Sequence, residues 1–325
     1  MFSKMNRLKK SGFTMFTVLL SSMLILSGCG SKTEEQKPAA EPAKQEVKYT
    51  VKHAMGETPI EGTPEKVVVL TNEGTEALLA MGVKPVGAVK SWTGDPWYAH
   101  IKADMEGVQV VGDESQPNLE AIAALQPDLI IGNKMRQEKV YEQLKAIAPT
   151  VMSEDLRGNW RKNFTLYAEA LNKKAEGDKA LADWDARVAE FKTQAGDKLK
   201  TEVSMVRFMA GKTRIYYNNT FSGMIFKELG LARPEKQNVE EFAAEVGKER
   251  IPEMEGDILF YFTYDTGNGE ANKTEQEWLN DSLFKNLEVV KAGKAYKVDD
   301  AIWNTAGGIR AANLLLDDLG SYLLK

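Results

Sequence analysis

Short apolar segments alternate with helical segments in two stretches of this 325-residue chain. The first stretch opens with an apolar, β-branched run at 66–70, and the helical pattern that follows it ends at Gly82. The alternation returns with a helix at 119–125, with Asn118 as its N-cap, and a strand at 128–131. Strands that are apolar throughout are buried on both faces, and helices that connect them place them parallel. The pattern predicts an α/β fold with two Rossmann-like lobes whose sheets are mostly parallel.

The alternation is interrupted once, between residues 161 and 198. This segment contains no proline, and its apolar residues recur at helical spacing, which predicts one long α-helix. The alternation then resumes and continues to a C-terminal helix. We therefore expect an N-terminal lobe at 51–160, a connecting helix at 161–198 and a C-terminal lobe at 199–325.

The N-terminus has the features of a secretory signal. Four basic residues precede an uncharged apolar run at 13–26, and small residues follow it. The run is shorter than the roughly 20 apolar residues that span a bilayer, so we expect its removal. The stretch "LSGCG" at 26–30 resembles the lipobox of bacterial lipoproteins. This resemblance implies a signal peptide at 1–28, acyl chains such as palmitate on Cys29, and anchoring to the extracytoplasmic face of the cell membrane.

The composition after the signal excludes several classes of structure and partner. Cys29 is the only cysteine, so the fold cannot depend on an internal disulfide. Residues 29–50 are charged and rich in Pro and Ala, which predicts a flexible tether. The formal net charge of −5 becomes −9 without the four basic residues of the signal. Nucleic acid is excluded as a partner, because it requires a basic footprint.

Residues that carry out catalysis are scarce. The chain has two histidines, His53 and His100, and neither falls in a metal-ligand pattern. The sequence also lacks a G-x-S-x-G elbow, a G-x-x-x-x-G-K-[ST] loop and a G-x-G-x-x-G fingerprint after the first strand. We therefore expect no enzymatic activity, no resident metal and no cofactor other than the lipid on Cys29.

Aromatic and cationic residues instead gather in the loops and at the strand ends. Ligands of open α/β sheets bind beyond the carboxyl ends of the strands. Arginine supplies planar donors that suit carboxylates, while aromatic rings supply flat apolar walls. The combination predicts a small, anionic and partly apolar ligand. The candidate binding residues are Trp92, Arg136, Arg161, Arg207, Tyr216 and Trp303.

Other residues of the same types are predicted to have ordinary roles. Trp184 and Trp278 lie in helical contexts and are expected to pack in the core. Lys162, Arg233 and Arg250 are expected to be solvated.

With these features, the chain resembles the substrate-binding lipoproteins of bacterial ABC importers for iron–siderophore complexes. The resemblance is carried by "LSGCG", the helical segment after Arg161, "PEKVVVLTNEGTEALLAMGVKPVGAV" at 64–89, "NLEAIAALQPDLIIG" at 118–132 and "AIWNTAGGIRAANLLLDDL" at 301–319. It implies a monomer that holds a ferric siderophore between its lobes and moves them little. It also implies that Glu120 and Glu249 dock to the permease subunits of the ABC transporter.

The resemblance leaves the ligand open. The mixture of Trp and Arg fits a citrate-based hydroxamate or a ferric citrate-like chelate best, and the chelator rather than the protein would coordinate the iron(III). Haem and cobalamin binders share the fold and remain alternatives. Direct binding of zinc or manganese would require ligands that the chain does not offer. An extracytoplasmic enzyme and a purely structural surface lipoprotein are the more distant alternatives.

Overall fold

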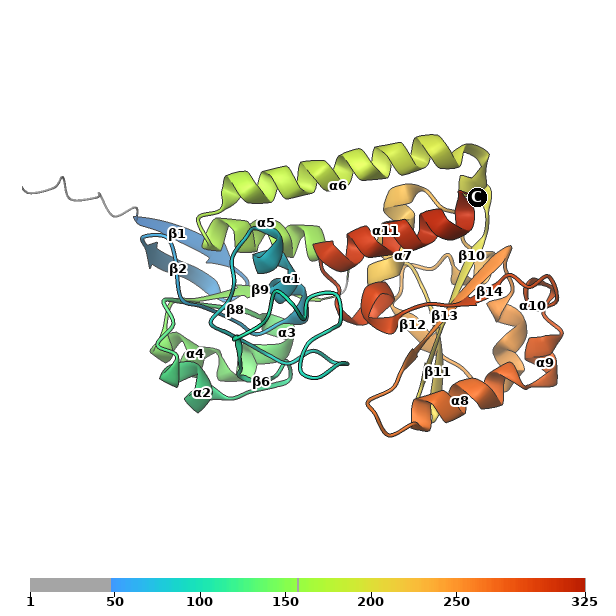
Figure 1. The fold of residues 1–325 in the computed structure, drawn as a ribbon, viewed down its shortest axis with the longest axis horizontal. Coiled ribbons are helices and arrows are strands. Elements are labelled where there is room, and N and C mark those ends of the chain that lie inside the picture. Colours follow the sequence, from blue (N-terminus) through green and yellow to red (C-terminus); the bar gives the residue numbers. More distant parts are fainter. Residues whose placement is uncertain (1–47, 157, 325) are drawn as a thin grey trace, which may run out of the picture. The chain divides into compact units, whose positions relative to one another are not determined.

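The computed structural model describes residues 48–156 and 158–324. The predicted signal peptide at 1–28, Cys29 and the tether up to residue 47 lie outside the described residues, so these predictions stay predictions. The described residues form two lobes, each built on a five-stranded sheet, and helix α6 passes from one lobe to the other (Figure 1).

The sheet of the first lobe is entirely parallel, as the alternating pattern predicted. Its strand order is β5-β4-β3-β8-β9, so β3 lies at the centre and the chain proceeds outward from it on both sides. The strands are β3 Val67–Val69, β4 Gly87–Ala88, β5 Gln109–Val110, β8 Leu129–Asn133 and β9 Thr150–Ser153. The helices are α1 Asn72–Ala80, α2 Leu119–Ala124, α3 Lys134–Gln137 and α4 Tyr141–Ile147.

Two antiparallel hairpins accompany this sheet. The first pairs β1 Lys48–His53 with β2 Gly56–Glu61, so residues 48–50, which we assigned to the tether, belong to a strand. The assignment failed because most side chains of the hairpin are exposed and polar, while Val51 and Ile60 anchor it to the core. The second hairpin pairs β6 Gly112–Asp113 with β7 Gln116–Pro117.

The sheet of the second lobe is mixed, with order β12-β11-β10-β13-β14. Strand β10 pairs antiparallel with β11 and parallel with β13, because a short turn rather than a helix connects β10 to β11. The strands are β10 Val203–Met209, β11 Lys212–Tyr216, β12 Ala243–Glu245, β13 Ile258–Tyr264 and β14 Ala295–Lys297. The helices are α7 Phe221–Leu229, α8 Glu270–Leu279, α9 Ser282–Lys285, α10 Glu288–Lys291 and α11 Ile309–Leu323.

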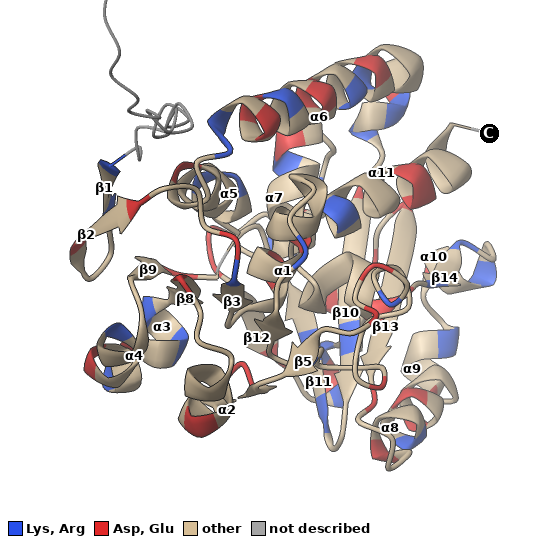
Figure 2. Cartoon of the chain, turned by 60° about the vertical axis from the view of Figure 1, so that its left-hand side comes forward, with Lys and Arg blue, Asp and Glu red and all other residues tan. Residues whose placement is uncertain are grey.

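The connecting segment is two helices rather than the single helix predicted at 161–198. Helix α5 covers Trp160–Ala170, and the long helix α6 covers Lys174–Ala195. The chain turns between them at Asn172, whose φ is +53°. Gly177 lets α6 pack closely on α5, because a Cβ at this position would lie 2.5 Å from the Cβ of Ala168. Acidic and basic residues alternate along α6 (Figure 2).

One hydrophobic cluster runs through both lobes and the helices between them. Trp184 is fully buried in it, and Trp278 is buried in the outer core of the second lobe, so the packing roles predicted for both are confirmed. Helix α11 contacts α1 and α5 in the first lobe as well as α7 in the second. Its first turn is capped from the first lobe, since Glu76 Oε2 accepts the Ala311 N–H at 2.9 Å.

Candidate functional site

A cavity of about 570 Å³ lies between the two lobes. The first lobe contributes the loops that follow β3, β4, β8 and β9 and the turn of the β6–β7 hairpin. The second lobe contributes strands β10 and β11, the end of β13 and the segment before α11. The lining residues include Glu73, Trp92, Glu114, Met135, Arg136, Trp160, Arg207, Arg214, Tyr216, Phe221, Phe242, Tyr264 and residues 304–307.

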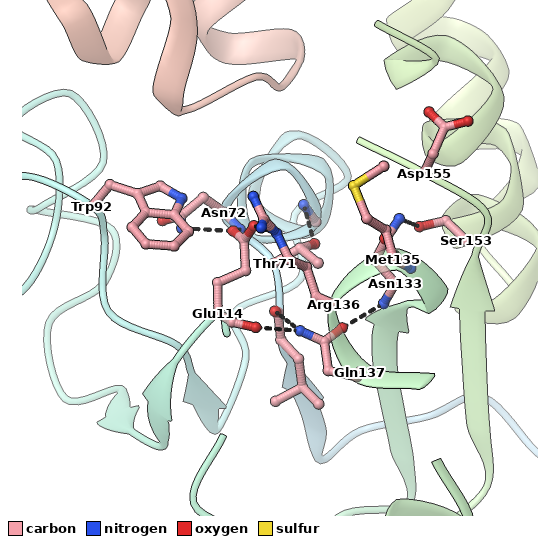
Figure 3. Close-up of polar contacts among 12 residues, drawn as sticks. Thr71, Asn72, Trp92, Glu114, Asn133, Met135, Arg136, Gln137, Ser153 and Asp155 are labelled. Atoms are coloured by element: carbon pink, nitrogen blue, oxygen red, sulfur yellow. Dashed lines mark hydrogen bonds and ion pairs between the residues drawn. The ribbon is translucent and has the colours of Figure 1, made fainter. Parts of the chain in front are cut away.

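In the first lobe, Arg136 and Trp92 form one wall of the cavity (Figure 3). The Arg136 guanidinium lies 5.6 Å from the centre of the Trp92 ring. Its Nε donates to Glu114 Oε1 at 3.2 Å. Glu114 Oε2 accepts both the backbone N–H and the side-chain amide of Asn72, at 3.1 and 3.0 Å. Among residues 48–156 and 158–324, none accepts a hydrogen bond from the two terminal nitrogens of the Arg136 guanidinium, so both can donate to a ligand.

Gln137, which follows Arg136, is fully buried and holds this wall in place through its side-chain amide (Figure 3). Its Nε2 donates to the carbonyl of Glu114 at 2.5 Å and to that of Leu70 at 3.2 Å. Its Oε1 accepts the Asn133 N–H at 2.7 Å. The end of β8, the segment after β3 and the turn of the β6–β7 hairpin are thus joined through one buried amide, which orders the side chains that they carry.

In the second lobe, Arg207 is held in one position by partners on several sides. Its Nε and Nη2 donate to the two carboxylate oxygens of Asp300 at 2.6 and 2.9 Å, and its Nη1 donates to the Tyr216 hydroxyl at 3.0 Å. The Tyr264 ring lies 4.6 Å away. Burial lowers the pKa of Arg207, but Tyr216 and Asp300 outweigh that effect and the net pKa is raised. The charge is therefore permanent, and its position is fixed.

Glu73 brings a buried carboxyl group to the same cavity. It lies in the first turn of α1 and is 7% exposed. Its Oε1 accepts hydrogen bonds from Asn163 Nδ2 at 2.9 Å and from the Tyr167 hydroxyl at 3.2 Å. Burial raises the pKa of Glu73 well above its usual value, and the nearby carboxylates Glu114 and Asp155 add to this, while the two hydrogen bonds oppose it.

Comparison with known proteins identifies the family. Residues 67–302 match the family described as Periplasmic binding protein. The chain belongs to this family. It is 52% identical to the "Probable siderophore-binding lipoprotein YfiY" of Bacillus subtilis (strain 168), with 97% of this chain and 99% of the relative covered. It is also 30% identical to the "Fe(3+)-citrate-binding protein YfmC" of the same organism, with 93% and 94% covered.

The fold of this periplasmic binding protein is similar to that of solved structures in the same class. The crystal structure of Staphylococcus aureus SirA complexed with staphyloferrin B is 38% identical and superposes with a TM-score of 0.79. The match covers 85% of this chain and 98% of SirA. The predicted α/β fold class and the resemblance to siderophore-binding proteins of ABC importers are therefore confirmed.

Four of the six predicted binding residues of this periplasmic binding protein line the cavity, namely Trp92, Arg136, Arg207 and Tyr216. Their role in binding stays a prediction. Trp92 and Arg136 follow strands β4 and β8, Tyr216 ends β11, and Arg207 lies within β10.

Arg161, also predicted to bind the ligand, does not line the cavity. Its Nη1 donates to Glu228 at 2.8 Å and lies 2.7 Å from Asp185 Oδ1 on α6. The reason is helical geometry, because neighbouring residues of a helix point about 100° apart. Trp160, one residue earlier, takes the place at the cavity.

Trp303 does not line the cavity either. It is fully buried, its ring lies 4.5 Å from that of Phe260, and its Nε1 donates to Asp318 at 2.9 Å. It belongs to a π-helical turn, Ala301–Thr305, and this turn presents its last residues and the following ones to the cavity. Arg233, expected to be solvated, is also buried, and it donates to the carbonyl of Tyr216 at 2.6 Å.

Sequence reasoning missed the carboxyl groups and part of the aromatic wall. Glu73 and Glu114 were missed because acidic residues did not fit an anionic ligand. Both follow predicted strands, and this position is a signal that could have found them. Phe242 and Tyr264 were missed because the sequence does not show that strand pairing brings them to the cavity.

The two residues predicted to dock to a permease are exposed. Glu120 lies in the first turn of α2, and Glu249 lies in a 3-10 helical turn at Lys248–Met254. Their docking role stays a prediction.

No group of three or more His, Cys, Asp or Glu side chains within 48–156 and 158–324 is placed to hold a metal ion. Across the same residues, no helix has the length and apolar character of a membrane span.

Proposed function

We propose that this chain is a lipid-anchored extracytoplasmic binding protein that captures a ferric siderophore and delivers it to an ABC permease, without catalysing a reaction. The proposed ligand is a citrate-based hydroxamate or a ferric citrate-like chelate. The observation that carries the proposal is the cavity between the lobes, in which three arginines alternate with aromatic rings.

The side chains of the cavity suit the outer oxygens of a chelate rather than bare iron. Arginine is always protonated, so Arg136, Arg207 and Arg214 can donate to carboxylate or hydroxamate oxygens but cannot ligate a metal. The rings of Trp92, Tyr264 and others supply apolar walls for the chelator backbone. Iron(III) would keep the ligands that its chelator provides.

The relatives support the same ligand class. YfiY is named as a probable siderophore-binding lipoprotein, YfmC as a Fe(3+)-citrate-binding protein, and SirA was solved with staphyloferrin B. The name of YfiY also supports the lipid anchor predicted at Cys29, although that residue lies outside the described part of the chain.

Intrinsic tryptophan fluorescence tests the ligand class, because Trp92 and Trp160 line the cavity. The protein is titrated with ferric schizokinen, ferric citrate, a ferric catecholate, haem and cobalamin. We expect tight, saturable quenching by schizokinen or citrate complexes of iron and no turnover of the chelate. Arg136→Ala should weaken binding at least about tenfold, whereas Arg161→Ala, as the matched control outside the cavity, should not. Preferential binding of haem or cobalamin, or no response to any compound, would refute the proposed ligand.

Delivery is tested separately from capture. Reversal of both exposed carboxylates, Glu120→Lys with Glu249→Lys, should abolish uptake into cells and leave the affinity for the chelate intact. Cys29→Ser should release the protein from the membrane without changing that affinity. We expect a monomer in both cases. Loss of chelate affinity in the charge-reversed variant would argue against a docking role.

A further inference from the structure

Glu73 is a carboxyl group of the cavity with an unusual set of partners. Both donors to its Oε1, Asn163 and Tyr167, are neutral. Among the described residues, none forms an ion pair with Glu73, and none donates a hydrogen bond to its Oε2. This contrasts with Glu114, which contacts Arg136, and with Asp300, which contacts Arg207.

The charges around Glu73 favour its neutral form. Its own helix carries Glu76, which is paired with His100. The titratable and charged groups around it are Glu114 in the β6–β7 turn, Asp155 after β9, Tyr167 on α5, Arg136 on α3, the Glu76–His100 pair, and Arg207 and Arg214 on the wall of the second lobe. Burial and the two nearby carboxylates, Glu114 and Asp155, each oppose the ionisation of Glu73. Arg136 and Arg207 are already paired with Glu114 and Asp300.

We propose that Glu73 carries a proton and donates it in a hydrogen bond from Oε2 to an oxygen of the bound chelate. The proposal rests on the proposed function, because the acceptor is a carboxylate or hydroxamate oxygen of that chelate. A protonated carboxyl accepts at one oxygen and donates at the other. Glu73 thereby serves Asn163 and Tyr167 on one side and the ligand on the other.

The proposal makes capture depend on a proton. Ionised Glu73 would place a negative oxygen against a negative ligand, so the bound chelate favours the protonated form. At a pH above the pKa of Glu73 in the free protein, binding must take up one proton, and the affinity falls by up to tenfold per pH unit. Glu73 therefore selects acceptor-rich ligands and weakens their binding in alkaline medium.

Glu73→Gln tests this proposal, because glutamine keeps the acceptor oxygen and replaces the O–H donor by N–H donors that do not titrate. The dissociation constants of ferric schizokinen and ferric citrate are measured for both proteins between pH 5 and pH 8. We expect the two proteins to agree within about threefold at pH 5, and the wild type to weaken relative to the variant by up to about tenfold per pH unit once Glu73 ionises. The ratio of the two constants cancels any change in the chelate itself.

Glu275→Gln is the matched control, because Glu275 is a buried carboxylate outside the cavity that contacts Lys297 at 2.5 Å. Its ratio to the wild type should not change with pH. Parallel pH profiles of the wild type and Glu73→Gln overturn the proposal if carbon-13 NMR also finds Glu73 ionised across this range. Weaker binding by Glu73→Gln at every pH overturns it as well, because Glu73 would then be an acceptor.

Failure of the proposed function leads to a different result. If neither chelate binds to either protein, the ligand is wrong, and titration of the Glu73 carboxyl in the free protein then decides the proposal. Carbon-13 NMR with labelled glutamate follows that carboxyl, whose signal is assigned by its loss in Glu73→Gln. A midpoint above the range of exposed glutamates supports the proton, and a midpoint within that range overturns it.

Discussion

Replacement of Asp300 by Asn should destabilise the protein and misplace Arg207. The two side chains are 5% and 9% exposed and share two short hydrogen bonds, so the pair is desolvated. Asparagine retains one acceptor but turns its amide donor toward an arginine donor and leaves a buried charge without compensation. Breaking such a pair costs about 3–5 kcal/mol. With a urea m-value of roughly 3 kcal/mol/M, the unfolding midpoint should fall by at least about 1 M.

Urea unfolding followed by fluorescence measures this cost, and chelate titration measures the effect on the cavity. We expect a loss of at least about tenfold in affinity, since Arg207 loses the partner that orients it. The double variant Arg207→Met with Asp300→Leu is the control. It should recover much of the stability, because apolar groups of similar volume can replace a buried pair, while chelate binding stays weak. A loss in Asp300→Asn below about 1 kcal/mol would refute the reasoning, because exposed pairs contribute no more than that.

Four further substitutions test the packing between and within the lobes and the wall of the cavity. Glu76→Ala removes the cap of α11 and should cost about 1–3 kcal/mol in unfolding free energy, measured by urea titration. Gly177→Val forces α6 away from Ala168 and should cost about 1–3 kcal/mol, and an unchanged unfolding midpoint would contradict the close packing of the helices. Trp303→Ala should cost about 3–5 kcal/mol, whereas Trp92→Ala should cost less stability and more chelate affinity. If Trp303→Ala lost more chelate affinity and less stability than Trp92→Ala, Trp303 rather than Trp92 would belong to the binding site.

The fold was predictable from the sequence where local patterns decide structure. The parallel sheet of the first lobe follows from the alternation of apolar strands and helices, and Asn118 caps α2 as expected, since its Oδ1 accepts the Ala121 N–H at 3.0 Å. The break at Asn172 was missed because the residues around it continue the helical spacing. The β1–β2 hairpin was missed because its strands bury only Val51 and a few other residues.

The site was predictable only in part, because position along the chain does not fix the direction of a side chain. Arg136 and Arg207 reach the cavity because a strand or its following loop aims them there. Arg161 and Trp303 also lie in sequence stretches that contain aromatic and basic residues. The helical turns that carry them direct Arg161 toward α6 and Trp303 into the core. Glu73 shows a further limit, since its role depends on partners that lie about 90 residues away.

The shared core of the lobes has a consequence for the kinetics of capture. Both α6 and α11 contact elements of each lobe, and Glu76 binds the start of α11 from the opposite side of the cavity. The recognition surface is therefore assembled before the ligand arrives. Association should then proceed at a rate set by diffusion and charge, and similar for related chelates. These chelates should differ mainly in residence time. The natural ligand should therefore be the chelate that dissociates most slowly.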